Sequence, residues 1–264
     1  MARAGFRPDN TKRMPTLAVF AILAVSALAT SFISGILGMA GGMILMGILI
    51  ALLPLPAAMM LHGITQLASN GWRAFLWRHE VVWAVFRGYG YGSLVALAGF
   101  VAVQLVVSKA AALVILGLTP FLALALPEKW HLNVERRWHP FSCGLICTGL
   151  GLLAGVSGPI LDVFFVRSKM TRHAVVATKA ATQSLGHSIK ILYFGELVAG
   201  GAPVDLWIAI PMVVLAFIGT SFSRQVLEKM NDASFRKWTR WTVLTCGIFY
   251  LVSGALLLAG QHMK

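Results

Sequence analysis

Long, uninterrupted apolar stretches run along this chain from residue 17 to residue 259, and they constrain its fold more than any other feature. A bilayer core roughly 30 Å thick is crossed by a helix of about 20 mostly apolar residues. Because lipid offers the backbone no hydrogen-bond partner, only helices and closed barrels cross it, and these stretches are continuous rather than alternating. With 58% hydrophobic and 12% charged residues, the chain lacks the polar surface of a water-soluble globule. The sequence predicts an all-α, polytopic membrane protein.

The apolar segments alternate with short polar or glycine-rich connections, and two segments are too short to span alone. Each short segment follows a glycine-rich break, at 38–42 (GMAGG) and at 155–159 (GVSGP). We therefore expect about eight helical segments, with a kinked or re-entrant helix at each break. The expected segments are 17–37, 43–53, 58–77, 83–106, 110–126, 140–154, 159–166, 173–194, 204–223 and 238–259.

The second half of the sequence repeats the first at one constant offset of 117 positions. At this offset Gly38 aligns with Gly155, and Thr65-Gln66 aligns with Thr182-Gln183, without a gap. Glycine breaks are common in membrane helices, so the repeated Thr-Gln pair carries most of the weight. We expect two homologous halves, at 17–127 and 140–260, joined by a connector at 128–139 and preceded by a basic tail at 1–16.

Loop charges indicate how the two halves lie in the membrane. Lys and Arg are concentrated in the connections at 78–79, 129–137, 167–172 and 224–237, and are absent from those at 54–56 and 196–205. Positively charged loops stay in the cytoplasm, and corresponding loops of the two halves then fall on opposite sides of the membrane. The halves are therefore expected to have inverted topology, an architecture of many secondary transporters. The side of the N-terminus stays open, because strict symmetry puts it outside whereas its basic residues favour inside.

The two breaks are the first candidates for a binding site. A break inside the membrane frees backbone groups that only protein, water or a ligand can satisfy. The helices expected to begin after Gly41-Gly42 and after Gly158 present N–H donors and a partial positive charge, which suit an anion. Ser157 adds a hydroxyl to the second break. The alternative is that these glycines serve only close helix packing.

A polar stripe follows each break on the next helix. Side chains spaced by three or four residues share a helical face, and ionisable groups in lipid are costly, so both stripes should face the protein interior or water. Arg73 and Lys190 are alternatively interfacial, with their side chains reaching a headgroup region, and His187 alternatively makes a structural hydrogen bond. The first stripe is His62, Gln66, Ser69 or Asn70, and Arg73; the second is Lys179, Gln183, His187 and Lys190. The expected midplane set is Thr65, Gln66, Asn70, Thr182, Gln183 and His187.

The sequence gives few signs of proton coupling, metal binding or nucleic-acid binding. Asp162 is a carboxylate inside an apolar run, and we expect it to pair with Lys179 or another cation rather than to carry a coupling proton. Cys143 and Cys147 lie one turn apart without a supporting His or acid, so packed thiols are expected and no metal or cofactor. The net charge of +13 lies in short loops, so we expect membrane lipids as partners and no nucleic acid.

The segment 34–42 (SGILGMAGG), a Pro-containing loop, a polar helix and a degenerate second copy around 155–159 resemble the TauE/SafE family of sulfite exporters. The resemblance covers nearly the whole chain. It implies a bacterial inner-membrane transporter of about eight helices that moves sulfite, sulfonates or other small organosulfur or carboxylate anions. The usual run of three glycines is replaced here by AGG in one half and SGP in the other, which bears on the substrate more than on the fold.

The sequence thus favours a secondary transporter of a small anion, and the family resemblance implies export, with sulfite or an organosulfonate as the expected substrate. Alternatives are a passive small-anion channel and an uptake permease for a carboxylate or sulfur anion, with protons as a candidate coupling ion. An intramembrane enzyme would need paired acids, an activated nucleophile or a metal set at depth, and the sequence has none of these patterns. The sequence does not decide the oligomeric state, and a homo-oligomer stays open.

Overall fold

The computed structural model describes residues 17–127, 130, 132–197, 204–229 and 232–262, and these contain ten α-helices and no strand. The expected basic tail at 1–16 lies outside the described residues, as does part of the connector. A 3₁₀ turn (Arg78–Glu80) precedes α4, and a π-helical turn (Tyr193–Leu197) follows α8. The helices are α1 (Leu17–Leu37), α2 (Ala40–Leu52), α3 (Leu55–Leu76), α4 (Trp83–Val103), α5 (Lys109–Ala125), α6 (His139–Ala154), α7 (Gly158–Phe165), α8 (Arg172–Leu192), α9 (Leu206–Lys229) and α10 (Asp232–His262).

The helix boundaries follow the internal repeat. The helices α3 and α8 begin 117 positions apart, at Leu55 and Arg172, and α1 and α6 end 117 positions apart, at Leu37 and Ala154. Each apolar segment expected from the sequence corresponds to one of these helices. The prediction of an all-helical polytopic protein is confirmed.

Both glycine-rich segments break a helix, as predicted. Gly38 and Gly155, which are equivalent at the 117-residue offset, have φ angles of +67° and +85°. An L-residue in this left-handed region costs about 1–2 kcal/mol, so glycine is the natural residue at both positions. The helices α1 and α6 end at these breaks, and α2 and α7 then begin as separate helices. Pro159 lies in the first turn of α7, where its missing N–H costs no intrahelical bond.

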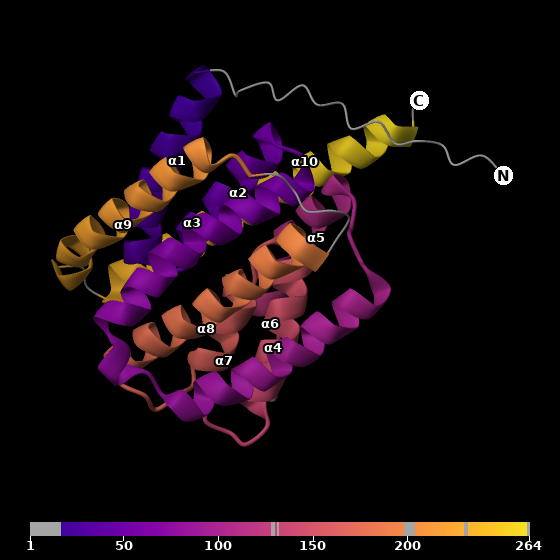
Figure 1. The fold of residues 1–264 in the computed structure, drawn as a ribbon. Helices are drawn as coiled ribbons and strands as arrows, with labels where there is room; N and C mark the ends of the chain where they lie inside the picture. Colours follow the sequence, from indigo (N-terminus) through magenta and orange to yellow (C-terminus); the bar gives the residue numbers. More distant parts are fainter. Residues whose placement is uncertain (1–16, 128–129, 131, 198–203, 230–231, 263–264) are drawn as a thin grey trace.

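Equivalent helices of the two halves pack against each other in antiparallel pairs. In the α3–α8 pair, Gly63 lies against Lys190, Gly71 lies against Ser184, and Trp77 stacks on His173 with ring centroids 4.7 Å apart. The pair α5–α10 is also antiparallel. The remaining long helices exchange partners, because α1 packs on α9 while α4 packs on α6 (Figure 1). The α3–α8 pair therefore lies where the two halves meet.

Several described helices suit a membrane environment. Four stretches are long and apolar enough to cross a bilayer: α1, α4, Leu206–Ser223 of α9 and Lys237–Gly260 of α10. Large apolar side chains also cover the outside of the bundle, with Leu17 83% exposed and Trp207 79% exposed. In water such a surface would be unfavourable, whereas hydrocarbon is its natural solvent.

The basic connections gather at one end of the molecule. Asn133 Nδ2 donates to the carbonyl of Arg167 (3.0 Å), and Trp77 stacks on His173. The helix α9 runs toward this same end, since Trp72 near the end of α3 donates to Ser221 (3.0 Å). Because α1 is parallel to α9, with Gly35 against Ser223 and Ser31 against Gly219, the start of α1 lies at the opposite end (Figure 1).

Candidate functional site

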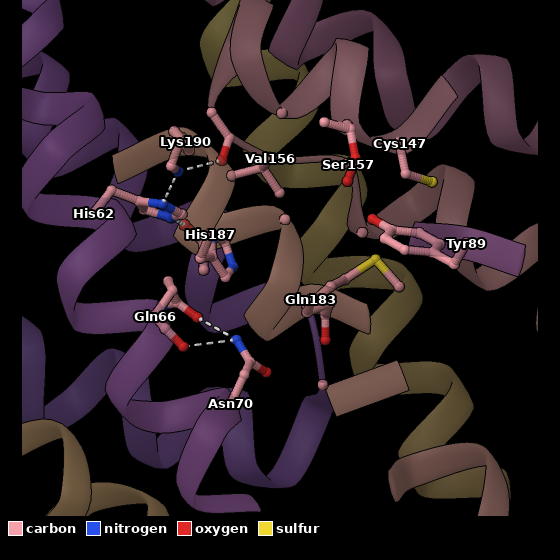
Figure 2. A pocket seen from close by; sticks show the side chains of 18 residues that line it. His62, Gln66, Asn70, Tyr89, Cys147, Val156, Ser157, Gln183, His187 and Lys190 are labelled. Atoms are coloured by element: carbon pink, nitrogen blue, oxygen red, sulfur yellow. Dashed lines mark hydrogen bonds between the residues drawn. The ribbon is translucent and has the colours of Figure 1, made fainter. Parts of the chain in front are cut away.

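A cavity lies where the two breaks meet. Gly158 lies against the Met39 side chain, so that the second break packs directly on the first. Residues of both breaks line the cavity together with side chains from α3, α4, α6 and α8 (Figure 2). Its volume of about 30 Å³ is sufficient for one or two water molecules, so a larger guest requires side chains to move.

Lys190 ties the two breaks together. Its side chain is 1% exposed, and its Nζ donates to the Gly155 carbonyl (2.9 Å) and to His62 Nδ1 (2.7 Å). His62 Nε2 lies 2.9 Å from the Gly42 carbonyl, which can only accept, so the ring proton is assigned to Nε2 and Nδ1 is free to accept from Lys190. The hydrogen-bond chain thus runs from Gly42 in the first break to Gly155 in the second (Figure 2). The alternative that Lys190 reaches a headgroup region is wrong, because the ammonium lies inside the protein.

Gln66 contributes a donor that has no partner. Its side chain is 3% exposed, and its Oε1 accepts from Asn70 Nδ2 at 3.3 Å. Its Nε2 has no hydrogen-bond partner among the described residues. A buried donor without a partner costs about 1–3 kcal/mol, so an acceptor that enters the cavity would gain a bond with no competing protein bond to break.

The cavity lining has an electropositive character. Among the described residues, it contains one lysine and two histidines but no carboxylate. The rings of His62 and His187 approach edge to face, with centroids 5.5 Å apart. The first turn of α7 adds backbone N–H groups at Gly158. The lining therefore suits an anion and offers nothing to balance a cation.

Most of the residues proposed from sequence come together at this cavity, although they come from separate segments of the chain. Both predicted glutamines line it, as do predicted residues of both breaks, so side chains from the two stripes meet at one cavity. The predicted residues that line the cavity are Gly42, His62, Gln66, Asn70, Ser157, Gly158, Gln183, His187 and Lys190.

The predicted threonines lie elsewhere. Thr65 donates to the Leu61 carbonyl (2.8 Å) and Thr182 donates to the Lys179 carbonyl (2.9 Å), and both threonines are fully buried. Each hydroxyl thus satisfies a backbone acceptor of its own helix. In each repeated Thr-Gln pair, the glutamine faces the cavity and the threonine does not.

The other charged candidates also lie outside the cavity lining. Asp162 and Lys179 form the expected ion pair, beside a separate groove between α5, α7, α8 and α10. Arg73 lies one turn beyond Asn70 on α3. The uncharged candidate Gly41 is also outside the lining and packs against Ser34 of α1. A Cβ added at Gly41 would lie 2.5 Å from the Ser34 Oγ.

Sequence reasoning missed the contributions of α4 and α6. Tyr89 of α4 and Cys147 and Thr148 of α6 line the cavity, and Thr148 donates to Ser93 (2.8 Å). The Cys143 and Cys147 sulfurs lie 3.9 Å apart as free thiols. One available signal was the 117-residue offset, which pairs Thr148 with another hydroxyl at Ser31. Nothing in the sequence of α4 pointed to Tyr89.

Comparison with known proteins agrees with this geometry. The family model described as "Sulfite exporter TauE/SafE" matches residues 22–250, which include all ten helices in whole or in part. No curated protein and no solved structure matches the chain significantly. Since the match covers most of the chain, this protein is a membrane transporter and belongs to the TauE/SafE sulfite exporter family.

Proposed function

We propose that this transporter carries a small oxyanion, sulfite or an organosulfonate, and that the anion binds in the cavity between the two helix breaks. The family match supports the substrate class. The residues proposed to bind the anion are Gln66, Asn70, Gln183, His187, Ser157 and the backbone at Gly42 and Gly158, with Lys190 supplying the positive charge.

The observation that carries this proposal is the pairing of a buried cation with a spare donor. Lys190 uses two of its three N–H donors on His62 and Gly155, and the Gln66 amide nitrogen has no partner among the described residues. No carboxylate among the described lining residues competes for either group. An oxyanion would satisfy both, and charge-assisted bonds of this kind contribute about 1.5–3 kcal/mol each.

Export is the direction we propose. An inside-negative potential of 100 mV favours outward movement of each negative charge by about 2.3 kcal/mol, so export needs no coupling ion. Uptake of the same anion would require one, and protons are the candidate. We place the transporter in the bacterial cytoplasmic membrane, with the basic connections on the cytoplasmic side.

We also propose that the two halves have inverted topology. The helices α3 and α8 are equivalent in the repeat and pack antiparallel, so they would cross a membrane in opposite directions. The start of α1 lies at the end opposite to the basic connections, which supports an outside N-terminus. Labelling of single cysteines at residues 54 and 169 from each side of the membrane tests this assignment, and labelling of both from one side would contradict it.

Binding and transport are tested separately. Purified protein is screened by thermal shift with sulfite, sulfoacetate, taurine and acetate, because a ligand that binds only the folded form raises its melting temperature. Proteoliposomes are then tested for exchange of labelled sulfite against an internal unlabelled pool. Saturable counterflow is expected of a carrier, whereas non-saturable flux would indicate a channel. Stabilisation by cations alone would refute anion binding.

A further inference from the structure

Unpartnered polar groups also lie beyond the cavity, on α1 and α3. Among the described residues, the buried side-chain atoms without a hydrogen-bond partner include Ser31 Oγ, Ser34 Oγ, Gln66 Nε2 and Arg73 Nη2. Ser31 and Ser34 are 0% and 2% exposed. Such groups are rare in folded proteins because each one costs about 1–3 kcal/mol, so a cluster of them needs a reason.

The internal repeat relates this cluster to the cavity. At the offset of 117, Ser31 corresponds to Thr148, Ser34 to Gly151 and Arg73 to Lys190. Gln66 likewise corresponds to Gln183, and all four counterparts line the cavity. The unpartnered groups therefore stand at the positions that the repeat makes equivalent to four residues of the cavity lining.

Contacts within the structure bring these groups to one place. Ser34 lies against Gly41. The next residue is Gly42, and a Cβ added there would lie 3.4 Å from the Gln66 side chain. Ser31 lies against Gly219 of α9, and the adjacent Thr220 hydroxyl bonds to Ser69 (2.7 Å) on α3. Ser31, Ser34 and Gln66 therefore lie where α1, the start of α2 and α3 meet, and Arg73 follows Ser69 by one turn on the same face of α3. Gly41 and Gly158, its repeat counterpart, each allow a close approach of a neighbouring segment, Ser34 of α1 in one case and Met39 in the other.

The charges of the two places also correspond. In the cavity, His62 accepts a hydrogen bond from Lys190. The repeat counterparts of these two are Lys179 and Arg73, which are both donors and cannot bond to each other. Lys179 instead pairs with Asp162, which stands where the first half has Leu45. The ion pair removes the charge of Lys179, and Arg73 remains as the excess cation, as Lys190 does in the cavity.

We propose that Ser31, Ser34, Gln66 and Arg73 form a second anion site, closed in this conformation, that receives the anion when the transporter adopts its other conformation. This site rests on the proposed function and takes the same class of oxyanion. Gln66 belongs to both sites, because it lies near the centre of the α3–α8 contact and lines the cavity as well. The anion would pass from Lys190 to Arg73 along this polar face, a path of about 15 Å, because Lys190 lies against Gly63 and Arg73 stands ten residues further along α3.

The test uses the double variant Ser31→Ala/Ser34→Ala and the single variant Arg73→Gln, with Arg87→Gln as the control. Arg87 is an exposed arginine on α4 outside both sites. Because the two serine hydroxyls have no bond to lose, the serine variant is expected to melt at the temperature of the unchanged protein or above it. Its thermal shift with sulfite should persist, since the cavity is intact. Counterflow of labelled sulfite should fall at least tenfold in both variants and stay unchanged in the control.

The outcomes separate the two proposals. Counterflow within threefold of the unchanged protein in both variants would overturn the second site and leave the cavity proposal standing. A melting temperature lowered by the serine substitutions would indicate a packing role and would also overturn it. If the unchanged protein shows neither stabilisation by sulfite or sulfoacetate nor counterflow, the proposed function fails, and the second site fails with it.

Discussion

Replacement of Lys190 by methionine is the sharpest test of the cavity. Methionine keeps most of the length and volume of the side chain but removes its charge and its donors. Lys190 is 1% exposed and bonds to His62 and to the Gly155 carbonyl, so nothing else in the cavity lining takes over its charge.

The structure allows the size of the effect to be estimated. A unit cation 4 Å from a unit anion contributes about 4 kcal/mol at an effective dielectric constant near 20. Since about 1.4 kcal/mol corresponds to a factor of ten, the dissociation constant of sulfite is expected to rise by two to three orders of magnitude. Folding is affected less, because the loss of two hydrogen bonds is offset by the removal of a buried ammonium, whose desolvation costs several kcal/mol.

Calorimetric titration of detergent-solubilised protein with sulfite measures this change, and the melting temperature without sulfite reports folding. Lys169→Met serves as the control, because Lys169 is an exposed lysine in the loop before α8. A folded Lys190→Met protein that binds sulfite within threefold of the unchanged protein would refute the role of Lys190. It would also remove the electrostatic basis for placing the anion in this cavity.

Three further predictions follow from the geometry. Gln66→Ala and Gln183→Ala should each weaken sulfite binding by about 10- to 100-fold, as one hydrogen bond to a charged ligand contributes roughly 1.5–3 kcal/mol; unchanged affinity by titration would remove the glutamines from the site. Gly155→Ala should lower the melting temperature more than Gly38→Ala, because both have positive φ but only at Gly155 does a Cβ meet a neighbour, Met46 Sδ at 2.7 Å. Asp162→Asn should leave the pH dependence of sulfite counterflow unchanged, since the carboxylate is paired with Lys179 outside the cavity; a shifted pH profile would assign it a coupling role.

Much of the fold was readable from the sequence for a local reason. A helix in lipid satisfies its backbone bonds within its own segment, so apolar length and glycine breaks determine where each helix begins and ends. The repeat offset then predicted the equivalence of Gly38 and Gly155, and the structure gives both a positive φ. The polar faces of α3 and α8 followed from spacing, which brought Gln66, Gln183 and His187 into the predicted set.

The sequence by itself thus determined the helices, their breaks, the repeat and the polar face of each repeat. Only the tertiary structure decided that Lys190 bonds to His62 and bridges to Gly155, that Thr65 and Thr182 turn to their own helices, and that Tyr89 and Thr148 complete the cavity. Helical spacing fixes which side chains share a face, but it does not fix which other helix that face meets. That choice depends on how helices far apart in the chain pack together, and close packing at glycine contacts such as Gly92 with α6 and Gly35 with α9 settles it here.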